Sequence, residues 1–233
     1  MPQHTVRQCP ASLPVQPAQA GPAQPPLEDT MKLYYSTGSC SLSPRIALHE
    51  AGLAYEGVLA PTKTKLLPDG SDYRRVNPKG YVPLLELDDG QRLGEGSAIV
   101  QYIADQAPDK GLAPPNGTLA RYRLQEWLHF IGSELHKGGF GVFFNPAAND
   151  EFKAATRAKL LDRLQWVNEQ LEGKTWLMGE QFTVADGYLF NITNWAKPTG
   201  LDLSPYAQLL AWRERVAARP AVQAAMKAEG LLG

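Results

Sequence analysis

Cys40 is the residue best suited to chemistry in this sequence, because it lies in the short polar segment "TGSCSLSP" just before an expected helix. Backbone N–H groups at the start of a helix are unpaired, and the helix dipole is positive there. Both effects stabilise a thiolate, so we expect the pKa of Cys40 to fall into the range of about 3.5–7.5 that such cysteines reach. Its small polar neighbours favour a solvent-accessible thiol, although a buried and inert cysteine is the common alternative.

The four residues from Cys40 to Ser43 have the form C-x-x-S, which is a dithiol exchange motif without its second thiol. Such a site can form a mixed disulfide with a small thiol, but it cannot resolve that disulfide internally. The motif is therefore compatible with chemistry on a small thiol compound.

Val82-Pro83 opens another expected strand, at a position where a proline removes no hydrogen bond from the sheet. A cis peptide bond there would leave the preceding backbone free to pair with a ligand. Since most X-Pro bonds are trans, the dipeptide alone leaves both isomers open.

Glu95-Gly96-Ser97 opens a further helix, and this helix end could hold the head group of an α-amino acid. Its free N–H groups suit a carboxylate, the carboxylate of Glu95 suits an ammonium, and Gly96 permits a close approach. Simple capping of the helix is the alternative interpretation of the same residues.

His129 and His136 lie seven residues apart on one expected helix, with Gly132 and Ser133 between them on the same face. Small residues between two imidazoles indicate a groove. Two metal-binding histidines on a helix normally stand at i and i+4 and have further ligands, so we expect no metal here.

The elements that must position the first of these residues form a small mixed α/β domain, because a helix crosses over between the first two strands. A helix is expected to start at Ser43-Pro44 and to end at Gly52, and Asp89-Gly90 supplies the positive φ of a tight turn. The expected elements are the strand "KLYY", the helix from Ser43, the strand "AYEGVLA", the hairpin 82–93, and the helix 95–107 with Ile99, Tyr102 and Ile103 on one face.

The rest of the chain is expected to be all α, because no convincing strand pattern follows the linker-like segment "APDKGLAPPNGT". Helices are expected around 118–137, 151–172, 184–195, 206–218 and 221–229. Thr183 and Asp186 have the spacing of a helix capping box, so we interpret Asp186 as structural and not as catalytic. The expected organisation is a disordered proline-rich tail 1–30, a first domain 31–108, a linker 109–117 and a helical domain 118–233.

Composition and charge exclude several classes of function. The formal net charge is −1, so nothing favours binding to nucleic acid or to an anionic membrane. No apolar run approaches the roughly 18 residues of a membrane-spanning helix. Two cysteines, Cys9 and Cys40, make no disulfide framework, so we expect reduced thiols and a cytoplasmic location. The tail holds 7 of the 19 prolines and lacks the apolar core of a secretory signal, and Cys9 has no expected role.

Five blocks of sequence, in order and at compatible spacing, resemble the glutathione S-transferases, most closely the bacterial beta class. The blocks are "GSCSLSPRI", "NPKGYVPLLELDDG", "EGSAIVQYIAD", "EWLHFIGSELHKG" and "FTVADGYLF", and the similarity covers Met31 to Gly233. The resemblance implies a thioredoxin-like, glutathione-binding N-terminal domain and an all-α C-terminal domain. It also implies a homodimer with glutathione bound between the domains.

The resemblance implies roles for individual residues of the first domain. Cys40 resembles the conserved thiol of the family, which faces or covalently joins the sulfur of glutathione. Val82, before a proline that is cis in the family, would pair through its backbone with the cysteinyl unit. Glu95 and Gly96 would hold the γ-glutamyl end. Lys65, which taken alone is a typical solvated charge, would reach the glycine carboxylate.

On the helical domain, the resemblance implies that His136, with Lys137 beside it, lines the cleft near the thiol and that Ser133 lies one turn earlier. The position of His129 usually holds an asparagine that contacts glutathione bound to the other subunit, so this histidine departs from the pattern. Three further departures are expected to alter the shape or affinity of the site: Thr37 for a proline, Tyr81 for a glutamine and Gly94 for a threonine.

The resulting hypothesis is a glutathione transferase that lowers the pKa of the glutathione thiol with donors from Cys40 and a helix N-terminus. The thiolate would attack a small apolar electrophile bound near His136, Phe140 and residues 194–198. We expect a thiol-disulfide or peroxidase side activity through Cys40, and a role in detoxification. Two alternatives are a glutathione-dependent dehalogenase or isomerase, and a non-catalytic interaction protein on the same fold.

Overall fold

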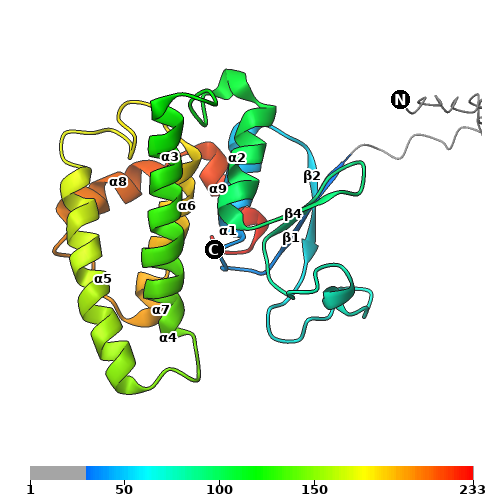
Figure 1. The fold of residues 1–233 in the computed structure, drawn as a ribbon, viewed down its shortest axis with the longest axis horizontal. Helices are drawn as coiled ribbons and strands as arrows, with labels where there is room; N and C mark the ends of the chain where they lie inside the picture. Colours follow the sequence, from blue (N-terminus) through cyan, green and yellow to red (C-terminus); the bar gives the residue numbers. More distant parts are fainter. Residues whose placement is uncertain (1–29, 233) are drawn as a thin grey trace, which may run out of the picture.

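The computed structural model describes residues 30–232, and Figure 1 shows a mixed α/β part beside a larger helical part. The expected tail before residue 30, including Cys9, lies outside the described residues. Within the described part, no helix combines the length and the apolar character needed to cross a membrane.

The N-terminal part is a four-stranded mixed sheet with the strand order β2-β1-β3-β4. β1 and β2 are parallel, whereas β1 with β3 and β3 with β4 are antiparallel, so the expected crossover helix and hairpin are both confirmed. The elements are β1 (Met31–Tyr35), α1 (Leu42–Ala51), β2 (Tyr55–Leu59), the 3-10 turn η1 (Tyr73–Arg75), β3 (Leu84–Glu86), β4 (Arg92–Gly94) and α2 (Gly96–Gln106).

The start of α1 differs from the expectation of a Ser43 cap. The helix begins at Leu42, and its N-cap residue is Ser41. The Ser41 hydroxyl makes no capping bond, because it donates to the carbonyl of Ser36 (3.2 Å) and accepts from the Ser36 N–H (3.1 Å). These two bonds close the loop before α1, so Cys40 lies one residue outside the N-cap.

The expected turn glycines are confirmed. Gly52 ends α1 in the left-handed region with φ 71°, a conformation that costs glycine little. In the hairpin between β3 and β4, Gly90 takes the positive φ of 79°.

The C-terminal part is helical, as expected. After the short 3-10 turn η2 (Pro108–Lys110), its elements are α3 (Leu119–Phe130), the π-helical segment η3 (Ile131–Phe140), α4 (Gly141–Phe143), α5 (Asp150–Gln170), α6 (Val184–Thr193), α7 (Ala196–Thr199), α8 (Ala207–Ala217) and α9 (Pro220–Ala228).

The expected helix 118–137 is not a uniform α-helix, because it widens into a π-helix at Ile131. Glycines permit this geometry: a Cβ built on Gly138 would lie 2.7 Å from the carbonyl oxygen of Ser133. Gly139, with φ −120° and ψ −107°, breaks the helical conformation. The short helix α7 was not expected from the sequence.

Thr183 and Asp186 form the expected capping box at the start of α6. Buried Asp186 also accepts hydrogen bonds from the backbone N–H of Leu177 (2.8 Å) and from the indole N–H of Trp212 (2.9 Å). These bonds fully occupy the carboxylate, so the structural interpretation of Asp186 is confirmed.

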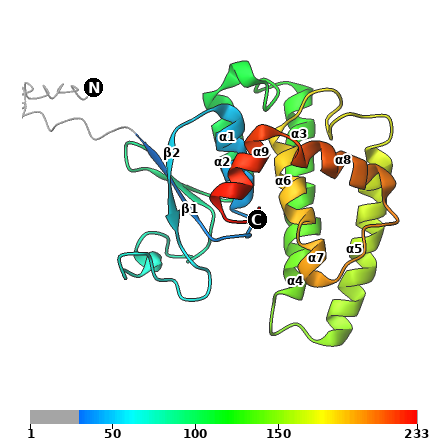
Figure 2. The same cartoon turned by 180° about the vertical axis from the view of Figure 1, so that it is seen from behind.

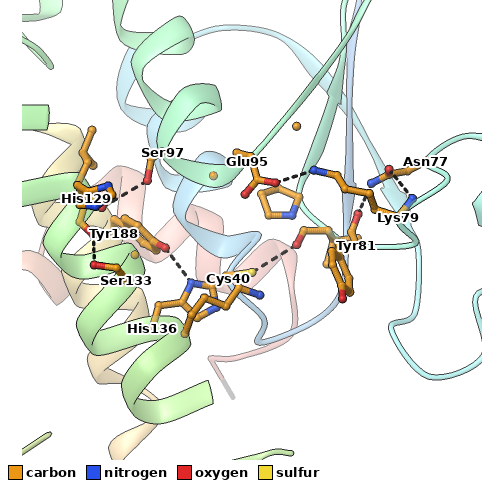
Figure 3. A pocket seen from close by; sticks show the side chains of 17 residues that line it. Cys40, Asn77, Lys79, Tyr81, Glu95, Ser97, His129, Ser133, His136 and Tyr188 are labelled. Atoms are coloured by element: carbon orange, nitrogen blue, oxygen red, sulfur yellow. Dashed lines mark hydrogen bonds and ion pairs between the residues drawn. The ribbon is translucent and has the colours of Figure 1, made fainter. Parts of the chain in front are cut away.

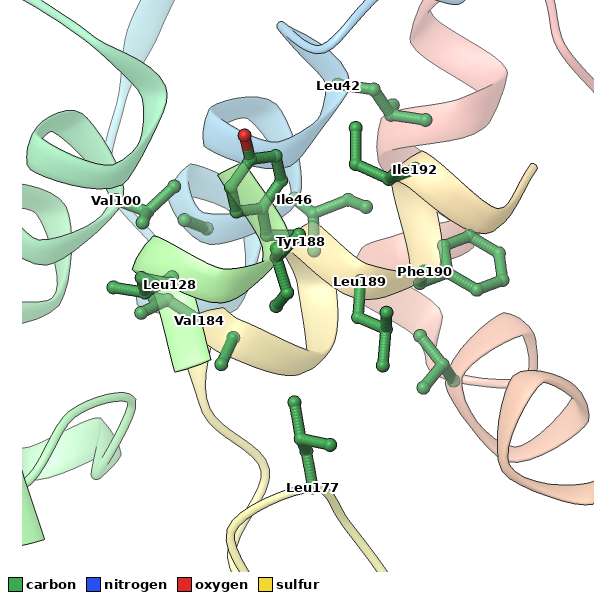
Figure 4. Packing of buried hydrophobic residues seen from close by; sticks show 14 of the residues in the cluster. Leu42, Ile46, Val100, Leu128, Leu177, Val184, Tyr188, Leu189, Phe190 and Ile192 are labelled. Atoms are coloured by element: carbon green, nitrogen blue, oxygen red, sulfur yellow. The ribbon is translucent and has the colours of Figure 1, made fainter. Parts of the chain in front are cut away.

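One continuous hydrophobic core joins the two parts. Leu42 and Ile46 of α1 pack toward Leu189 and Ile192 of α6, with Val100 of α2 close by (Figure 4). The opposite view in Figure 2 shows α9, at the end of the chain, lying beside α1. The helix that follows Cys40 is therefore covered by the helical domain.

Candidate functional site

A cavity of about 540 Å³ lies between the two domains, and Figure 3 shows its lining. It includes all but one of the residues that the sequence singled out for the site: Cys40, Val82, Glu95, Gly96, His129, Ser133, His136 and Lys137. Lys65 does not line the cavity. Ser97 of the expected helix start also lines it, together with residues that were not selected from the sequence, among them Asn77, Lys79 and Tyr188.

Cys40 and Val82 meet in this cavity although 42 residues separate them in the sequence. The Cys40 thiol donates a hydrogen bond to the carbonyl oxygen of Val82, with 3.4 Å between sulfur and oxygen (Figure 3). The peptide bond between Val82 and Pro83 is cis, in agreement with the resemblance.

The lowered pKa expected for Cys40 is wrong. Burial raises the pKa of the Cys40 thiol to about 11, because desolvation disfavours the thiolate. The positive charge of Lys137 and a backbone hydrogen bond lower this pKa, but by less than burial raises it. The helix dipole acts mainly within the first turn, and Cys40 precedes even the N-cap. At neutral pH Cys40 is thus a neutral thiol and a hydrogen-bond donor.

Glu95 precedes α2 and presents its carboxylate to the cavity. The side chain makes no capping bond to the helix, so capping does not explain this residue. Instead its carboxylate pairs with the ammonium of Lys79, with 2.6 Å between the atoms. The hydrogen bond from Lys79 lowers the pKa of Glu95, so the carboxylate is charged at neutral pH.

Gly96 follows directly and leaves room at this helix end. A Cβ built on Gly96 would have its nearest contact, Cγ of Pro83, at an ordinary 3.7 Å. Gly96 lines the cavity, but a Cβ would also fit there, so the close approach of a ligand at this position stays a prediction.

His136 is buried on the helical side of the cavity. Its Nδ1 atom lies 2.8 Å from the hydroxyl of Tyr188, and its ring meets the edge of Trp195 with 5.1 Å between the centroids. Burial, with a smaller contribution from the charge of Lys137, lowers the pKa of His136 to about 4. The imidazole is therefore neutral at physiological pH.

Two lysines approach Tyr81, which lines the cavity and is 61% exposed. The ammonium groups of Lys137 and Lys65 lie 5.4 and 5.9 Å from the centre of its ring. Lys65 also donates to the carbonyl of Gly80 at 2.5 Å. Lys65 therefore contacts the cavity only indirectly, through the ring of Tyr81, which lines it.

His129 and Ser133 lie on exposed parts of the same wall, and the Ser133 hydroxyl donates to the carbonyl of His129 at 2.9 Å. The structure therefore brings the two histidines, His129 and His136, to one cavity, as their spacing predicted.

The expected apolar wall for an electrophile needs one correction. Phe140 is fully buried in the core and does not face the cavity. Trp195, within the expected stretch 194–198, makes edge-to-face contacts with His136 and with exposed Phe144. The ring centroids of Trp195 and Phe144 are 5.4 Å apart. Trp195 and Phe144 do not line the cavity themselves but continue outward from His136, which does, so the apolar wall expected for an electrophile stays a prediction.

Two of the residues that the sequence analysis missed are central to this geometry. Lys79 lies three positions before Val82 in the block "NPKGYVPLLELDDG", and Tyr188 lies in "FTVADGYLF". Both blocks carry the family resemblance. The contacts that give the two residues their importance, to Glu95 and to His136, join different elements and are not visible in local sequence.

The charges of the lining suit an anion that also carries an ammonium group. Lys79 and Lys137 supply positive charge to the lining, and Glu95 supplies a carboxylate. Among residues 30–232, no group of three or more His, Cys, Asp or Glu side chains is arranged to hold a metal ion.

The chain is similar to proteins of one family along most of its length. Residues 37–106 match the model "Glutathione S-transferase, N-terminal domain", and residues 133–220 match "Glutathione S-transferase, C-terminal domain". Glutathione S-transferase GstA of Escherichia coli O157:H7 is 46% identical over 201 residues, which cover 86% of this chain and 100% of that protein.

Solved structures give the same result. BphK, described as a bacterial GST in a ternary complex, is 56% identical with a TM-score of 0.84, covering 86% of this chain and 100% of its own. The bacterial beta class glutathione S-transferase of Sphingomonas chungbukensis is 46% identical with a TM-score of 0.83, again covering 86% and 100%.

Proposed function

Because the chain belongs to the glutathione S-transferase family, we propose that its interdomain cavity binds glutathione and delivers the thiolate to a small apolar electrophile. The resemblance to the bacterial beta class, the thioredoxin-like domain followed by a helical domain, and the enzyme class expected from the sequence are confirmed. The observation that carries the proposal is the meeting of Cys40, Val82 and Glu95 in one cavity.

Charge complementarity supports glutathione as the ligand. Glutathione has one ammonium and two carboxylates, and a charged partner strengthens each hydrogen bond that such groups make. We assign the γ-glutamyl end to Glu95 and Gly96, with Lys79 close to the same end. We assign the glycine carboxylate to the rim where Lys65 and Lys137 approach Tyr81.

The cysteinyl unit of glutathione would pair with the backbone of Val82. In the structure the carbonyl of Val82 accepts a hydrogen bond from Cys40. The N–H of the cysteinyl unit would replace Cys40 as this donor, which releases the Cys40 S–H to face the sulfur of glutathione. His129 and Ser133, on the exposed part of the wall, are proposed as further contacts to the tripeptide.

Cys40 would act in conjugation as a donor and not as the nucleophile. With a pKa of about 11 it keeps its proton at neutral pH, and a preorganised donor stabilises a neighbouring anion. Glutathione would lose its thiol proton to solvent. Its sulfur would then form a bond to the electrophilic carbon, and the leaving group would depart with the electron pair of the bond that breaks.

The electrophile would bind against His136, Trp195 and Phe144. Neutral His136 holds its orientation through Tyr188, and the two aromatic side chains offer apolar surface. This wall supports the proposal of small apolar electrophiles, and hence of a role in detoxification.

A thiol-disulfide side activity at Cys40 is the second part of the proposal. Ser43, the serine that takes the place of the second thiol in the C-x-x-S motif, is buried. It accepts a hydrogen bond from the side-chain amide of Asn191 at 3.0 Å. A mixed disulfide at Cys40 would therefore be resolved by a second thiol molecule from solution.

Comparison of the wild type with Cys40→Ala tests both parts. We expect the variant to bind immobilised glutathione, to conjugate more slowly and to lose mixed-disulfide reduction. Conjugation at the wild-type rate would remove Cys40 from that reaction, and failure of the wild type to bind glutathione would refute the proposal as a whole.

We also propose a homodimer, as expected from the family, and a cytoplasmic location, as expected for a chain whose two cysteines make no disulfide framework. Light scattering of the purified full chain checks the first, and a particle of about one chain mass at micromolar concentration would contradict it. Fractionation of the source cells checks the second.

A further inference from the structure

The loop directly before Cys40 is held in place by the helical domain. Gly38, with φ 69°, donates its N–H to Oε2 of Glu229 (2.9 Å), and its carbonyl accepts from the indole N–H of Trp195 (2.9 Å). The next carbonyl, of Ser39, accepts from the side-chain amide of Asn191 (3.1 Å). Three side chains of the other domain thus fix consecutive backbone groups of this loop.

Glu229 differs from the other two because it also holds the helix that follows the loop. Its Oε1 accepts from Nε of Arg45 in α1 at 3.1 Å, and both side chains are almost completely buried. Arg45 is fixed in turn, since its guanidinium lies 4.0 Å from the ring centre of Tyr35 and donates to the hydroxyl of Tyr55 at 3.1 Å. The Glu229 carboxylate cannot turn away from Gly38 without leaving a buried charge unpaired.

If Glu229 only stabilised the fold, that role would account for its ion pair with Arg45 but not for its hydrogen bond to Gly38. A buried ion pair is weak evidence for stability, because apolar residues of similar volume often hold two helices equally well. An apolar residue could not, however, accept the hydrogen bond of the Gly38 amide. That bond therefore points to a function of the carboxylate in the loop.

We propose that Glu229 is a positioning residue for Cys40: held by Arg45, its carboxylate fixes the Gly38 amide and so the direction in which the thiol is presented to the cavity. This inference rests on the proposed function, in which Cys40 faces the sulfur of glutathione. Without the carboxylate the loop relaxes, so water reaches the thiol more easily while its alignment with glutathione is lost.

The structure provides a matched control. Glu50 of α1 pairs with Arg219 at the start of α9, at 2.6 and 2.7 Å, so it also joins α1 to the end of the chain. The Glu50 side chain does not bond to the loop before Cys40. Removal of either carboxylate should lower stability, but only removal of Glu229 should change the thiol.

The experiment compares Glu229→Ala and Glu50→Ala in the full chain, both carrying Cys9→Ala so that Cys40 is the only cysteine. For Glu229→Ala we expect Cys40 to react about tenfold faster with iodoacetamide at pH 8, while kcat for conjugation of glutathione to chlorodinitrobenzene falls about tenfold, since small misplacements at a reacting centre are costly. The KM for glutathione should stay within about twofold. Glu50→Ala should change neither rate.

The outcomes separate this inference from the proposed function. An unchanged alkylation rate, or equal changes in the Glu229 and Glu50 variants, would overturn the positioning role. Faster alkylation with unchanged kcat would support the positioning role and refute the participation of Cys40 in conjugation. If Glu229→Ala does not fold, Glu229→Gln should still alkylate faster than wild type, because the amide keeps one acceptor oxygen but loses the charge by which Arg45 holds it. A wild-type rate in a folded Gln variant would overturn the role of the carboxylate.

Discussion

The reactivity of Cys40 toward an alkylating reagent can be worked out from its surroundings. Burial raises the pKa of this thiol from its ordinary value of 9.0 to about 11, so at pH 7 its thiolate fraction is about a hundredfold below that of an ordinary cysteine. A more basic thiolate is intrinsically more nucleophilic, which with a Brønsted slope of about 0.4–0.5 returns a factor of roughly 6–10. The net expectation is alkylation about 10–20 times slower than for a free thiol.

The assay uses the Cys9→Ala variant, iodoacetamide and mass detection of the adduct between pH 6 and pH 11, with N-acetylcysteine as the reference thiol. The rate should rise steadily up to about pH 11 without a plateau near neutrality, and Cys9→Ala combined with Cys40→Ala should give no cysteine adduct. A rate that levels off between pH 5 and pH 7 would refute the reasoning, because it would show that the helix start outweighs burial at this position.

Three further predictions concern the cavity and its support. Glu95→Gln should raise the KM for glutathione about tenfold or more, since a hydrogen bond to a charged group contributes about 1.5–3 kcal/mol; steady-state kinetics with an unchanged KM would exclude Glu95 from binding. Burial lowers the pKa of His136 from 6.5 to about 4, so the unfolded chain binds a proton that the folded one does not between these pH values. The free energy of unfolding should therefore fall by about 2.4 kcal/mol as the pH drops from 7 to 4.5, and this component should vanish in His136→Asn when urea unfolding is compared at the same two pH values. Asp186→Ala should lower the free energy of unfolding by about 3 kcal/mol or more, because buried donors lose their acceptor; a loss below about 1 kcal/mol in urea unfolding would argue against its structural role.

Features with a local cause could be predicted from the sequence. Gly52 ends α1 because a left-handed residue closes a helix cheaply, and Asp186 caps α6 because its partner lies three positions away. The residues of the cavity were found because the family places them in recognisable blocks. In each case the information lies within a few neighbouring positions.

Features that depend on distant parts of the chain could not be predicted in the same way. The helix start near Cys40 is visible in sequence, but the burial that raises its pKa is supplied by other elements, and burial has the larger effect. Phe140 was placed on the cavity wall, whereas the π-helical segment turns it into the core. Lys79 gains its importance only through Glu95, which lies on another element.

A crystal structure of the protein with glutathione tests the central claim most directly. The account predicts a tripeptide in the interdomain cavity with its ammonium at Glu95, its cysteinyl N–H bonded to the carbonyl of Val82, and its sulfur facing Sγ of Cys40. A cavity that stays empty at saturating glutathione, or a bound tripeptide whose sulfur points away from Cys40, would contradict it.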